Sequence, residues 1–353
     1  MEFSSIILYW YLKNQRDFPW RKSKSVYKVW LSEIILQQTQ TSQGLSYYNK
    51  IINAFPTIKE LAEDSEEKIL KLWQGLGYYS RARNLHYTAK HIQNNLNGVF
   101  PNDYNNLIKL KGIGPYTAAA ISSICFNEKR AAVDGNVYRI LARVFNIYTP
   151  INSSTGIKTF QELANSLISE TNPGDYNQGL MDIGATICRP KSPKCNLCPL
   201  KSICIAYDNN TINDLPVKIK KIKIKQRYFH YFCVEYDGEF LMKKRTQQDI
   251  WKNLYDFPII EWTKANKENE IDYKEKLKSI IAVETVNIKK KKYYEHKLTH
   301  QKLNITIEYI KVDKIINHNN FIKVNRTQIE ELPVPKPIER FFKELFNSLD
   351  CKV

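Results

Sequence analysis

The stretch LIKLKGIGPYTAAAISSICFNEKRAAVDGN, residues 107–136, decides the fold. It predicts a helix, a tight turn at Gly112 and Gly114, a second helix from Pro115, and a short loop that ends at Asp134. Two glycines around one apolar residue allow a sharp turn with unshielded amide groups, and proline suits the first turn of a helix. Because amide groups at such a helix start bind phosphate, one interpretation is a phosphate seat with a nearby carboxylate. The other is a plain helical hairpin in which Asp134 caps the next helix.

Size and charge indicate two domains and a polyanionic partner. A chain of 353 residues is long enough for two domains that each bury a core. The formal net charge is +17, and basic side chains outnumber acidic ones both before and after residue 215. This balance favours a polyanion that contacts both domains. The sequence has no apolar run of about twenty residues and no secretory signal pattern, so we expect a cytoplasmic protein without a membrane partner.

One acidic residue interrupts an otherwise apolar helical segment. In KVWLSEIIL, residues 28–36, Glu33 lies among tryptophan, leucine and isoleucine side chains. A buried carboxylate without a partner is costly, and burial raises its pKa toward a value suited to donating a proton. Glu33 is therefore the leading candidate for a general acid. The alternative is that the helix directs this side chain to solvent.

Two polar segments suit contacts with nucleic acid bases. Gln38 and Thr39 directly follow the helix and carry donors and acceptors that can read base edges or fill a gap in a base stack. The loop GLGYYSRAR, residues 75–83, places Leu76 and Tyr78 among glycines and arginines. Such a composition is typical of loops that enter a groove and stack on bases. An exposed helix end and an ordinary interhelical turn are the alternative interpretations.

Four cysteines crowd into one short segment. Cys188, Cys195, Cys198 and Cys204 follow the pattern C-x6-C-x2-C-x5-C within residues 188–204. In a large chain without a secretory signal, such a group favours metal ligation over disulfides. A tetrahedral zinc ion and a 4Fe-4S cluster both accept four thiolates, and the spacing leaves these two alternatives open.

The composition changes at residues 208–226, where a polar stretch is followed by alternating lysines and apolar residues; we interpret this stretch as a linker. Beyond it, residues 227–245 predict two strands joined by a hairpin at Asp237 and Gly238. Strand patterns within 292–310 and an amphipathic helix near 338–349 complete an α+β domain. The sequence therefore predicts a first domain at residues 1–207 and a second at 227–353.

Several segments together resemble one enzyme family. They are WLSEIILQQTQ (30–40), WQGLGYYSRARNL (73–85), LKGIGPYTAAAI (110–121), VDGNVYRILAR (133–143) and MDIGATICRPKSPKCNLCPLKSIC (181–204). This combination is similar to the MutY-type adenine DNA glycosylases of the helix-hairpin-helix superfamily, and it spans nearly all of the first 205 residues. The second domain resembles the Nudix-like domain of that family, through FLMKKRTQQDIWKNLYDFP (240–258) and EHKLTHQKL (295–303).

The resemblance implies both a fold and a reaction. The fold is an all-α helix-hairpin-helix glycosylase domain with an iron-sulfur cluster loop, followed by an α+β Nudix-like domain. The reaction belongs to base excision repair: hydrolysis of the N-glycosidic bond of adenine mispaired with 8-oxoguanine or guanine in duplex DNA, which leaves an abasic site. The adenine must leave the base stack to be cleaved.

The resemblance also implies roles for catalytic residues. Glu33 would protonate the extruded adenine at N7, and Asp134 would stabilise the cationic sugar as the base departs. Tyr116 and Asn136 would support these acids, and Arg21 would lie near the adenine pocket. Two carboxylates with separated pKa values, one an acid and one ionised, suit cleavage through an oxocarbenium-like state.

Contacts with DNA, lesion and cofactor are implied in the same way. Residues matching contacts to the oxidised guanine or the gap in the stack are Gln38, Thr39, Leu76 and Tyr78, while Gly112 and Gly114 match the phosphate anchor. The four cysteines match the ligands of one 4Fe-4S cluster. In the second domain, Thr299 and His300 match the loop that reads 8-oxoguanine.

The sequence departs from its relatives in informative places. Bifunctional relatives carry a lysine nucleophile where this chain has Tyr116, so the resemblance implies a monofunctional reaction. The reading loop usually has phenylalanine where this chain has Leu298, so one aromatic contact is missing. The Nudix pyrophosphatase signature is missing between Phe257 and Val283, so the second domain should recognise nucleotides without hydrolysing them.

Two alternatives to the preferred function remain open at this point. One is an endonuclease III-like bifunctional glycosylase, and the other is a non-catalytic iron-sulfur protein that binds DNA. For the preferred function we expect a monomer that is associated with the nucleoid and binds duplex DNA containing an adenine:8-oxoguanine or adenine:guanine mispair.

Overall fold

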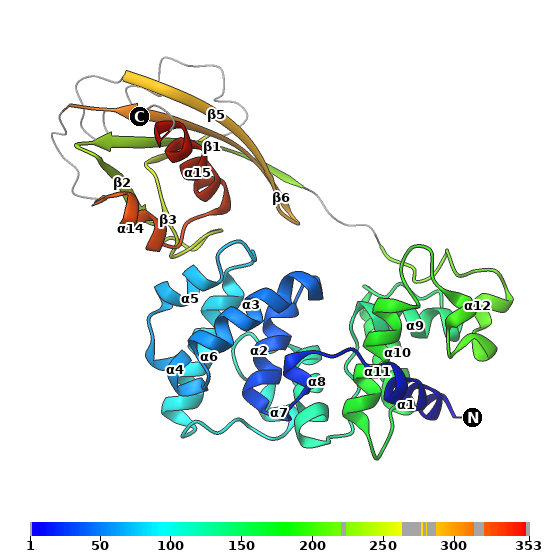
Figure 1. Ribbon diagram of the computed structural model, residues 1–353. Coiled ribbons are helices and arrows are strands. Elements are labelled where there is room, and N and C mark those ends of the chain that lie inside the picture. The colour runs from blue at the N-terminus through cyan, green and yellow to red at the C-terminus, as the bar shows by residue number, and fades with distance from the viewer. Residues whose placement is uncertain are drawn as a thin grey trace. The chain divides into compact units, whose positions relative to one another are not determined.

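The computed structural model describes residues 2–219, 224–262, 277, 280, 287–313 and 321–350. Two compact units make up the chain (Figure 1). Unit 1 contains Met1–Glu63 and Asn84–Lys220, and unit 2 contains Asp64–Arg83 and Lys221–Val353. Residues 64–83, which the sequence analysis assigned to the first domain, thus belong with the C-terminal residues. The stretch in which the Nudix signature was judged missing lies largely outside the described residues.

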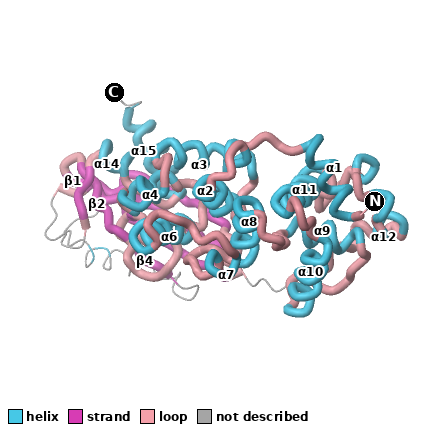
Figure 2. Tube along the Cα trace, turned by 90° about the horizontal axis from the view of Figure 1, so that it is seen from below, coloured by secondary structure: helices cyan, strands magenta, loops and turns pink. Residues whose placement is uncertain are grey.

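Unit 1 is helical. Its helices are α1 (Phe3–Asn14), α2 (Val26–Leu36), α3 (Thr41–Ala54), α4 (Ile58–Glu63), most of α6 (Ser80–Asn95), α7 (Tyr104–Leu107), α8 (Pro115–Phe126), α9 (Gly135–Val144), α10 (Ser154–Leu167), α11 (Pro173–Thr186) and α12 (Ile205–Asp208). Short 3-10 helices lie at Pro19–Arg21, Cys195–Leu197 and Lys201–Ile203. The helix α1 packs against α11, and α11 also packs against α8 and α9 (Figure 2). A core that includes Phe3, Ile7, Val137, Tyr176 and Ile183 joins the first helix to the second half of the unit.

The hairpin predicted at residues 107–136 is confirmed. Gly114 precedes α8, and Pro115 occupies its first turn. Gly112 has a φ of 84°, a left-handed conformation that favours glycine, and an added Cβ would lie 2.8 Å from Cβ of Asn84. The glycines of this turn therefore let the chain reverse against the neighbouring helix.

Side-chain caps begin two of the helices between residues 57 and 72. At α4 the backbone N–H of Thr57 donates to the Glu60 carboxylate, and the Glu60 N–H donates to the Thr57 hydroxyl. At α5 (Glu66–Leu72) the cap is Ser65, whose hydroxyl accepts from the N–H of Lys68, so the cap lies one residue after Asp64.

Unit 2 contains a mixed sheet. Its strands are β1 (Lys225–Tyr236), β2 (Glu239–Lys244), β3 (Tyr255–Asp256), β4 (Ile259–Trp262), β5 (Asn287–Lys297), β6 (Gln301–Lys311) and β7 (Ile322–Val324), and its helices include α5, α14 (Arg326–Glu331) and α15 (Lys336–Asp350). The main order is β3-β2-β1-β6-β5, with β4 paired to β1 and β7 to β2. The strands β1 and β6 are parallel, whereas β5 and β6 form an antiparallel hairpin.

The predicted hairpin between β1 and β2 is confirmed, because Asp237 and Gly238 both have positive φ at its tip. Phenylalanines of α15 contact the sheet side of unit 2: Phe342 packs edge-on against Phe240 and Phe257. Aromatic contacts between the terminal helix and the strands therefore close this core.

The first part of the expected linker, up to Val217, packs against the core of unit 1. Ile212, Leu215 and Val217 pack with the core of unit 1, and the Arg143 guanidinium donates to the carbonyls of Ile212 and Leu215. Strand β1 already begins at Lys225. None of the helices in the described residues combines the length and apolar character needed to cross a bilayer.

Candidate active site

A cavity of about 490 Å³ lies in unit 1 and contains both candidate acids. Glu33 comes from α2, Tyr116 from α8, and Asp134 and Asn136 from the start of α9, and all four line this cavity. Its volume falls within the range of pockets that hold small organic ligands. Residues distant in sequence therefore converge on a space suited to a single base.

Burial controls the ionisation of Glu33. Removal of the carboxyl from water raises the pKa of Glu33 from 4.5 to about 7, and the negative charge of Asp134 acts in the same direction. The Tyr116 hydroxyl and the Arg21 cation oppose this rise. A carboxyl with a pKa near neutrality can hold a proton at the pH of the cell and donate it.

Asp134 is held by the helix that it begins. Its Oδ1 accepts from the backbone N–H groups of Asn136 and Val137, each at 2.9 Å, so it is the N-cap of α9. The Asn136 side-chain amide donates to Oδ2 at 2.6 Å. Burial raises the pKa of Asp134, while these hydrogen bonds favour its ionised form. The interpretation of Asp134 as a helix cap is confirmed, and the side chain also lines the cavity; the phosphate seat stays a prediction.

A buried ion pair fixes Arg21 at the cavity. Its guanidinium donates to both carboxylate oxygens of Asp182, at 2.7 and 3.0 Å, and Arg16 Nε donates to the same carboxylate at 2.7 Å. Burial raises the pKa of Asp182, but the two arginines outweigh it and hold the pKa below its ordinary value. Asp182 therefore remains an anion that orients two cations at the cavity wall.

Other candidate residues occupy different places. Gln38, with a φ of 56°, and Thr39 line the same cavity. In unit 2, Tyr78 is 44 % exposed, whereas Leu76 is only 7 % exposed and does not protrude. Gly112 and Gly114 lie at the turn before α8, whose first amide groups are available to a ligand.

The four cysteines lie around one small cavity of unit 1. Cys188, Cys195, Cys198 and Cys204 line it together with Arg143, and all four are free thiols. Arg143 Nη1 lies 3.4 Å from the Cys188 sulfur. Within the described part of the chain, no three histidine, cysteine or acidic side chains are gathered closely enough to hold a single metal ion.

Arg139 connects the cysteine segment to the cavity. Its Nε donates to the Cys188 carbonyl at 2.6 Å, and its Nη2 donates to the Asn136 side-chain oxygen and to the Gly184 carbonyl, both at 2.8 Å. Because Asn136 in turn donates to Asp134, a continuous series of hydrogen bonds joins the two sites.

A second pocket, of about 370 Å³, lies within unit 2. Thr299 and His300 form the exposed tip of the β5–β6 hairpin and line this pocket, and the Leu298 N–H donates to the Gln301 carbonyl across the turn. The Tyr78 hydroxyl forms a short hydrogen bond with the Thr299 hydroxyl. The structure thus brings together three of the residues expected to contact a lesion.

The sequence analysis missed Asp182, Arg16, Arg139 and Met181, the last of which lies 3.3 Å from the Tyr116 hydroxyl. For Asp182 a signal was present, since it also interrupts an apolar helix, in GLMDIGA. The same argument that selected Glu33 would have selected it.

Comparisons with known proteins agree with this architecture. A model described as "HhH-GPD superfamily base excision DNA repair protein" matches residues 31–166, and a NUDIX domain model matches residues 230–344. A solved structure of a thermostable thymine-DNA glycosylase has 31% sequence identity and a TM-score of 0.54, and the match covers 59% of this chain and 95% of that one. The predicted fold class, a helix-hairpin-helix glycosylase domain followed by a Nudix-like domain, is confirmed.

Two relatives in other organisms share the same name. The adenine DNA glycosylase of Buchnera aphidicola subsp. Schizaphis graminum is 37% identical over 357 residues, covering 98% of this chain and 99% of that protein. The adenine DNA glycosylase of Arabidopsis thaliana is 37% identical over 310 residues, covering 75% of this chain and 49% of that protein. The chain therefore belongs to the adenine DNA glycosylases, enzymes of base excision repair that remove adenine from DNA.

Proposed function

We propose that this enzyme removes adenine paired with 8-oxoguanine or guanine in duplex DNA by hydrolysis alone, leaving an abasic site and an intact strand. The observation that carries the proposal is the cavity shared by Glu33 and Asp134. None of the described residues that line this cavity is a lysine, and position 116 is tyrosine. An amine nucleophile for a Schiff base is therefore missing from its wall, which supports a monofunctional reaction.

Glu33 acts as the general acid in this proposal. Protonation of the adenine at N7 turns the base into a better leaving group, and a carboxyl with a pKa of about 7 can supply that proton at neutral pH. After the base departs, the Glu33 carboxylate can accept a proton from the attacking water. Tyr116 lies beside Glu33 and limits how far its pKa rises.

Asp134 stabilises the cationic sugar. As the glycosidic bond breaks, positive charge develops on the sugar, and a fixed carboxylate lowers the energy of that state. Three hydrogen bonds, two from backbone N–H groups and one from Asn136, hold Asp134 in place and favour its ionised form. Asn136 therefore acts as a positioning residue, and Arg21 lines the part of the cavity where the extruded base would lie.

The DNA would be held on both sides of the mispair. The backbone N–H groups in the first turn of α8, after Pro115, suit a phosphate of the strand that carries adenine. On the partner strand, Gln38, Thr39 and Tyr78 offer polar or aromatic contacts, and Thr299 and His300 offer a hydroxyl and an imidazole to the oxidised base. Leu76 is buried, so its insertion into the base stack would require the loop to rearrange.

The cysteine segment is proposed to hold one 4Fe-4S cluster. The four thiols line one space, and four thiolates are the donor set that a 4Fe-4S cluster takes, as the family resemblance implies. Arg139 and Arg143 place positive charge beside the thiolates that such a group requires. When bound, the cluster would cross-link Cys188, Cys195, Cys198 and Cys204 and so fix the fold of this segment.

The proposal is tested with duplexes that carry adenine opposite 8-oxoguanine, guanine or thymine. The full-length enzyme should release free adenine from the first two and very little from the third, and the strand should break only after hot alkali. Borohydride should not trap a covalent complex. Strand cleavage without alkali, together with trapping, would instead support the endonuclease III-like alternative.

A Glu33→Gln variant distinguishes the proposed glycosylase from the remaining alternative, a non-catalytic iron-sulfur protein that binds DNA. It should bind the mispaired duplex like the parent and lose excision, whereas excision at the parental rate would remove Glu33 from the mechanism. Sedimentation of the complex should give one chain for each duplex, since we propose a monomer associated with the nucleoid.

A further inference from the structure

Three segments supply most of the lining of the pocket of unit 2: one lies within residues 75–83, and the other two, which we call its walls, are separate loops. One wall is the hairpin tip at residues 298–301, and the other is the segment 249–251 between β2 and β3. Trp251 is buried in the second wall and contacts the rings of Phe229 and His296. Recognition of a base in this pocket requires that the two walls keep a fixed separation.

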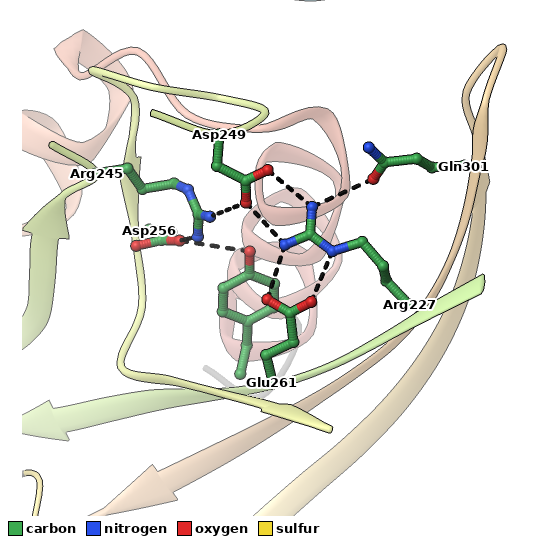
Figure 3. A network of polar contacts seen from close by, with 7 residues as sticks. Arg227, Arg245, Asp249, Asp256, Glu261 and Gln301 are labelled. Atoms are coloured by element: carbon green, nitrogen blue, oxygen red, sulfur yellow. Dashed lines mark hydrogen bonds and ion pairs between the residues drawn. The ribbon is translucent and has the colours of Figure 1, made fainter. Parts of the chain in front are cut away.

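A single buried arginine contacts both walls. Figure 3 shows Arg227 of β1 between Asp249, Glu261 and Gln301. Its Nη1 donates to Asp249 at 2.9 Å and to the side-chain oxygen of Gln301 at 3.2 Å, while Nη2 donates to the other oxygen of Asp249 at 2.7 Å. The far side of the guanidinium forms two bonds with Glu261, at 2.6 and 2.7 Å.

The backbone of the same strand supports the hairpin tip. The Lys225 N–H donates to the His300 carbonyl at 3.0 Å, and Arg227 follows two residues later, on the same side of the strand. Thr299 and His300 are themselves exposed. The bonds from β1 to His300 and Gln301 therefore support the turn on the side that faces the sheet. Strand β1 thus fixes the tip by one backbone bond and one side-chain bond.

The ion pair with Arg227 favours the ionised form of Asp249. Burial raises the pKa of Asp249, but the hydrogen bonds and charge of Arg227 outweigh it and hold the pKa below its ordinary value. Arg245 adds a bond to Asp249 at 3.2 Å and pairs with Asp256 at 2.6 Å, and within the described part of unit 2 neither bond involves the hairpin tip. Of the two arginines, Arg227 is the one that links Asp249 to Gln301.

We propose that Arg227 is a positioning residue for recognition of the oxidised base: by bonding Asp249 and Gln301 together, it fixes the pocket against which Thr299 and His300 meet 8-oxoguanine. The inference rests on the proposed function. Without Arg227 the hairpin tip would keep the contact of Thr299 with Tyr78 but lose the bond between Gln301 and the guanidinium. The preference for 8-oxoguanine over guanine would then fall while hydrolysis at Glu33 and Asp134 continued.

The experiment compares full-length variants on duplexes with adenine opposite 8-oxoguanine or guanine. Single-turnover rate constants give a ratio for each variant, and thermal unfolding reports stability. Because a hydrogen bond to a charged group is lost, Gln301→Leu and Arg227→Met should each lower the ratio about tenfold. Arg227→Lys keeps the charge but cannot bond both acceptors through a planar fork, so its ratio should also fall.

Arg245→Met is the matched control, since it removes an arginine from the same network and leaves the bond to Gln301 in place. It should unfold at a lower temperature and keep the parental ratio. A folded Gln301→Leu with the parental ratio would overturn the inference, as would an equal loss of ratio in Arg245→Met. If Arg227→Met does not fold, Gln301→Leu decides. If the parent releases adenine from neither duplex, the proposed function fails instead; a parent that acts equally on both duplexes overturns the inference alone.

Discussion

Replacement of Glu33 by glutamine should stabilise the protein at high pH. The change keeps the shape of the side chain and removes its ionisation. Below pH 4.5 the carboxyl is protonated in both the folded and unfolded states, so parent and variant should be similarly stable. Between pH 4.5 and about 7 the carboxyl of the parent ionises in the unfolded state and stays protonated in the folded state, so the free energy of unfolding falls. By a pH above about 7 the carboxyl is ionised in both states and this part of the stability is fully lost.

The magnitude follows from the pKa. A tenfold change in an ionisation constant is worth about 1.4 kcal/mol, so a rise from 4.5 to about 7 corresponds to about 3 kcal/mol. This figure is an upper limit, because the cavity is open to water and Glu33 is only half-buried. Glu33→Gln should therefore be up to about 3 kcal/mol more stable than the parent at pH 9, with no gain at pH 4.

Urea unfolding at several pH values, followed by far-ultraviolet circular dichroism, measures this difference, since the helices of unit 1 dominate the signal. Glu63→Gln, which changes a carboxyl on the exposed face of α4, is the matched control and should show no such dependence. If the stability gap between Glu33→Gln and the parent is the same at pH 5 and pH 9, the burial argument for Glu33 is wrong.

Three other results are expected. The single-turnover rate of adenine release should fall about tenfold for each pH unit above about 7, because the protonated form of Glu33 is required; a constant rate up to pH 9 would contradict this role. Asp134→Asn should keep α9, since asparagine is also a good N-cap, yet lower excision on the order of 1000-fold, as measured beside unchanged circular dichroism. Asp182→Asn should cost about 3 kcal/mol on unfolding, because it leaves the largely buried Arg21 and the partly exposed Arg16 without their anion. The unneutralised Arg21 should also lower the pKa of Glu33, and a pH–rate profile that does not move to lower pH would refute that link.

Helices and strands were largely predictable because their signals are local. Glycines, proline and apolar spacing identified the hairpin around α8, and Asp237 with Gly238 identified the turn between β1 and β2. The assignment of residues 64–83 to unit 2 was not predictable, because it depends on contacts with residues far along the chain: the Glu67 carboxylate accepts from Tyr255, and Arg83 donates to the Lys252 carbonyl.

The candidate site shows the same limit. Glu33 and Asp182 both interrupt apolar helices, and local sequence marks both as costly to bury. Their ionisation differs because Arg16 and Arg21, 166 and 161 residues away in the chain, bond Asp182 directly, whereas burial of Glu33 outweighs the weaker effect of the Arg21 charge on it. The sequence can therefore identify a carboxylate that is costly to bury, but only the fold shows whether a cation bonds it and lowers that cost.

Because Asp134 caps α9, its position in the cavity depends on the folding of that helix. The carboxylate that would face the cationic sugar also accepts hydrogen bonds from the first backbone N–H groups of α9. The first turn of this helix therefore sets the position of the reacting group. A substitution that frays this turn from a distance would displace the reacting oxygen without touching the cavity. Variants with weak activity and normal DNA binding should therefore be sought along α9 and the segment that precedes it.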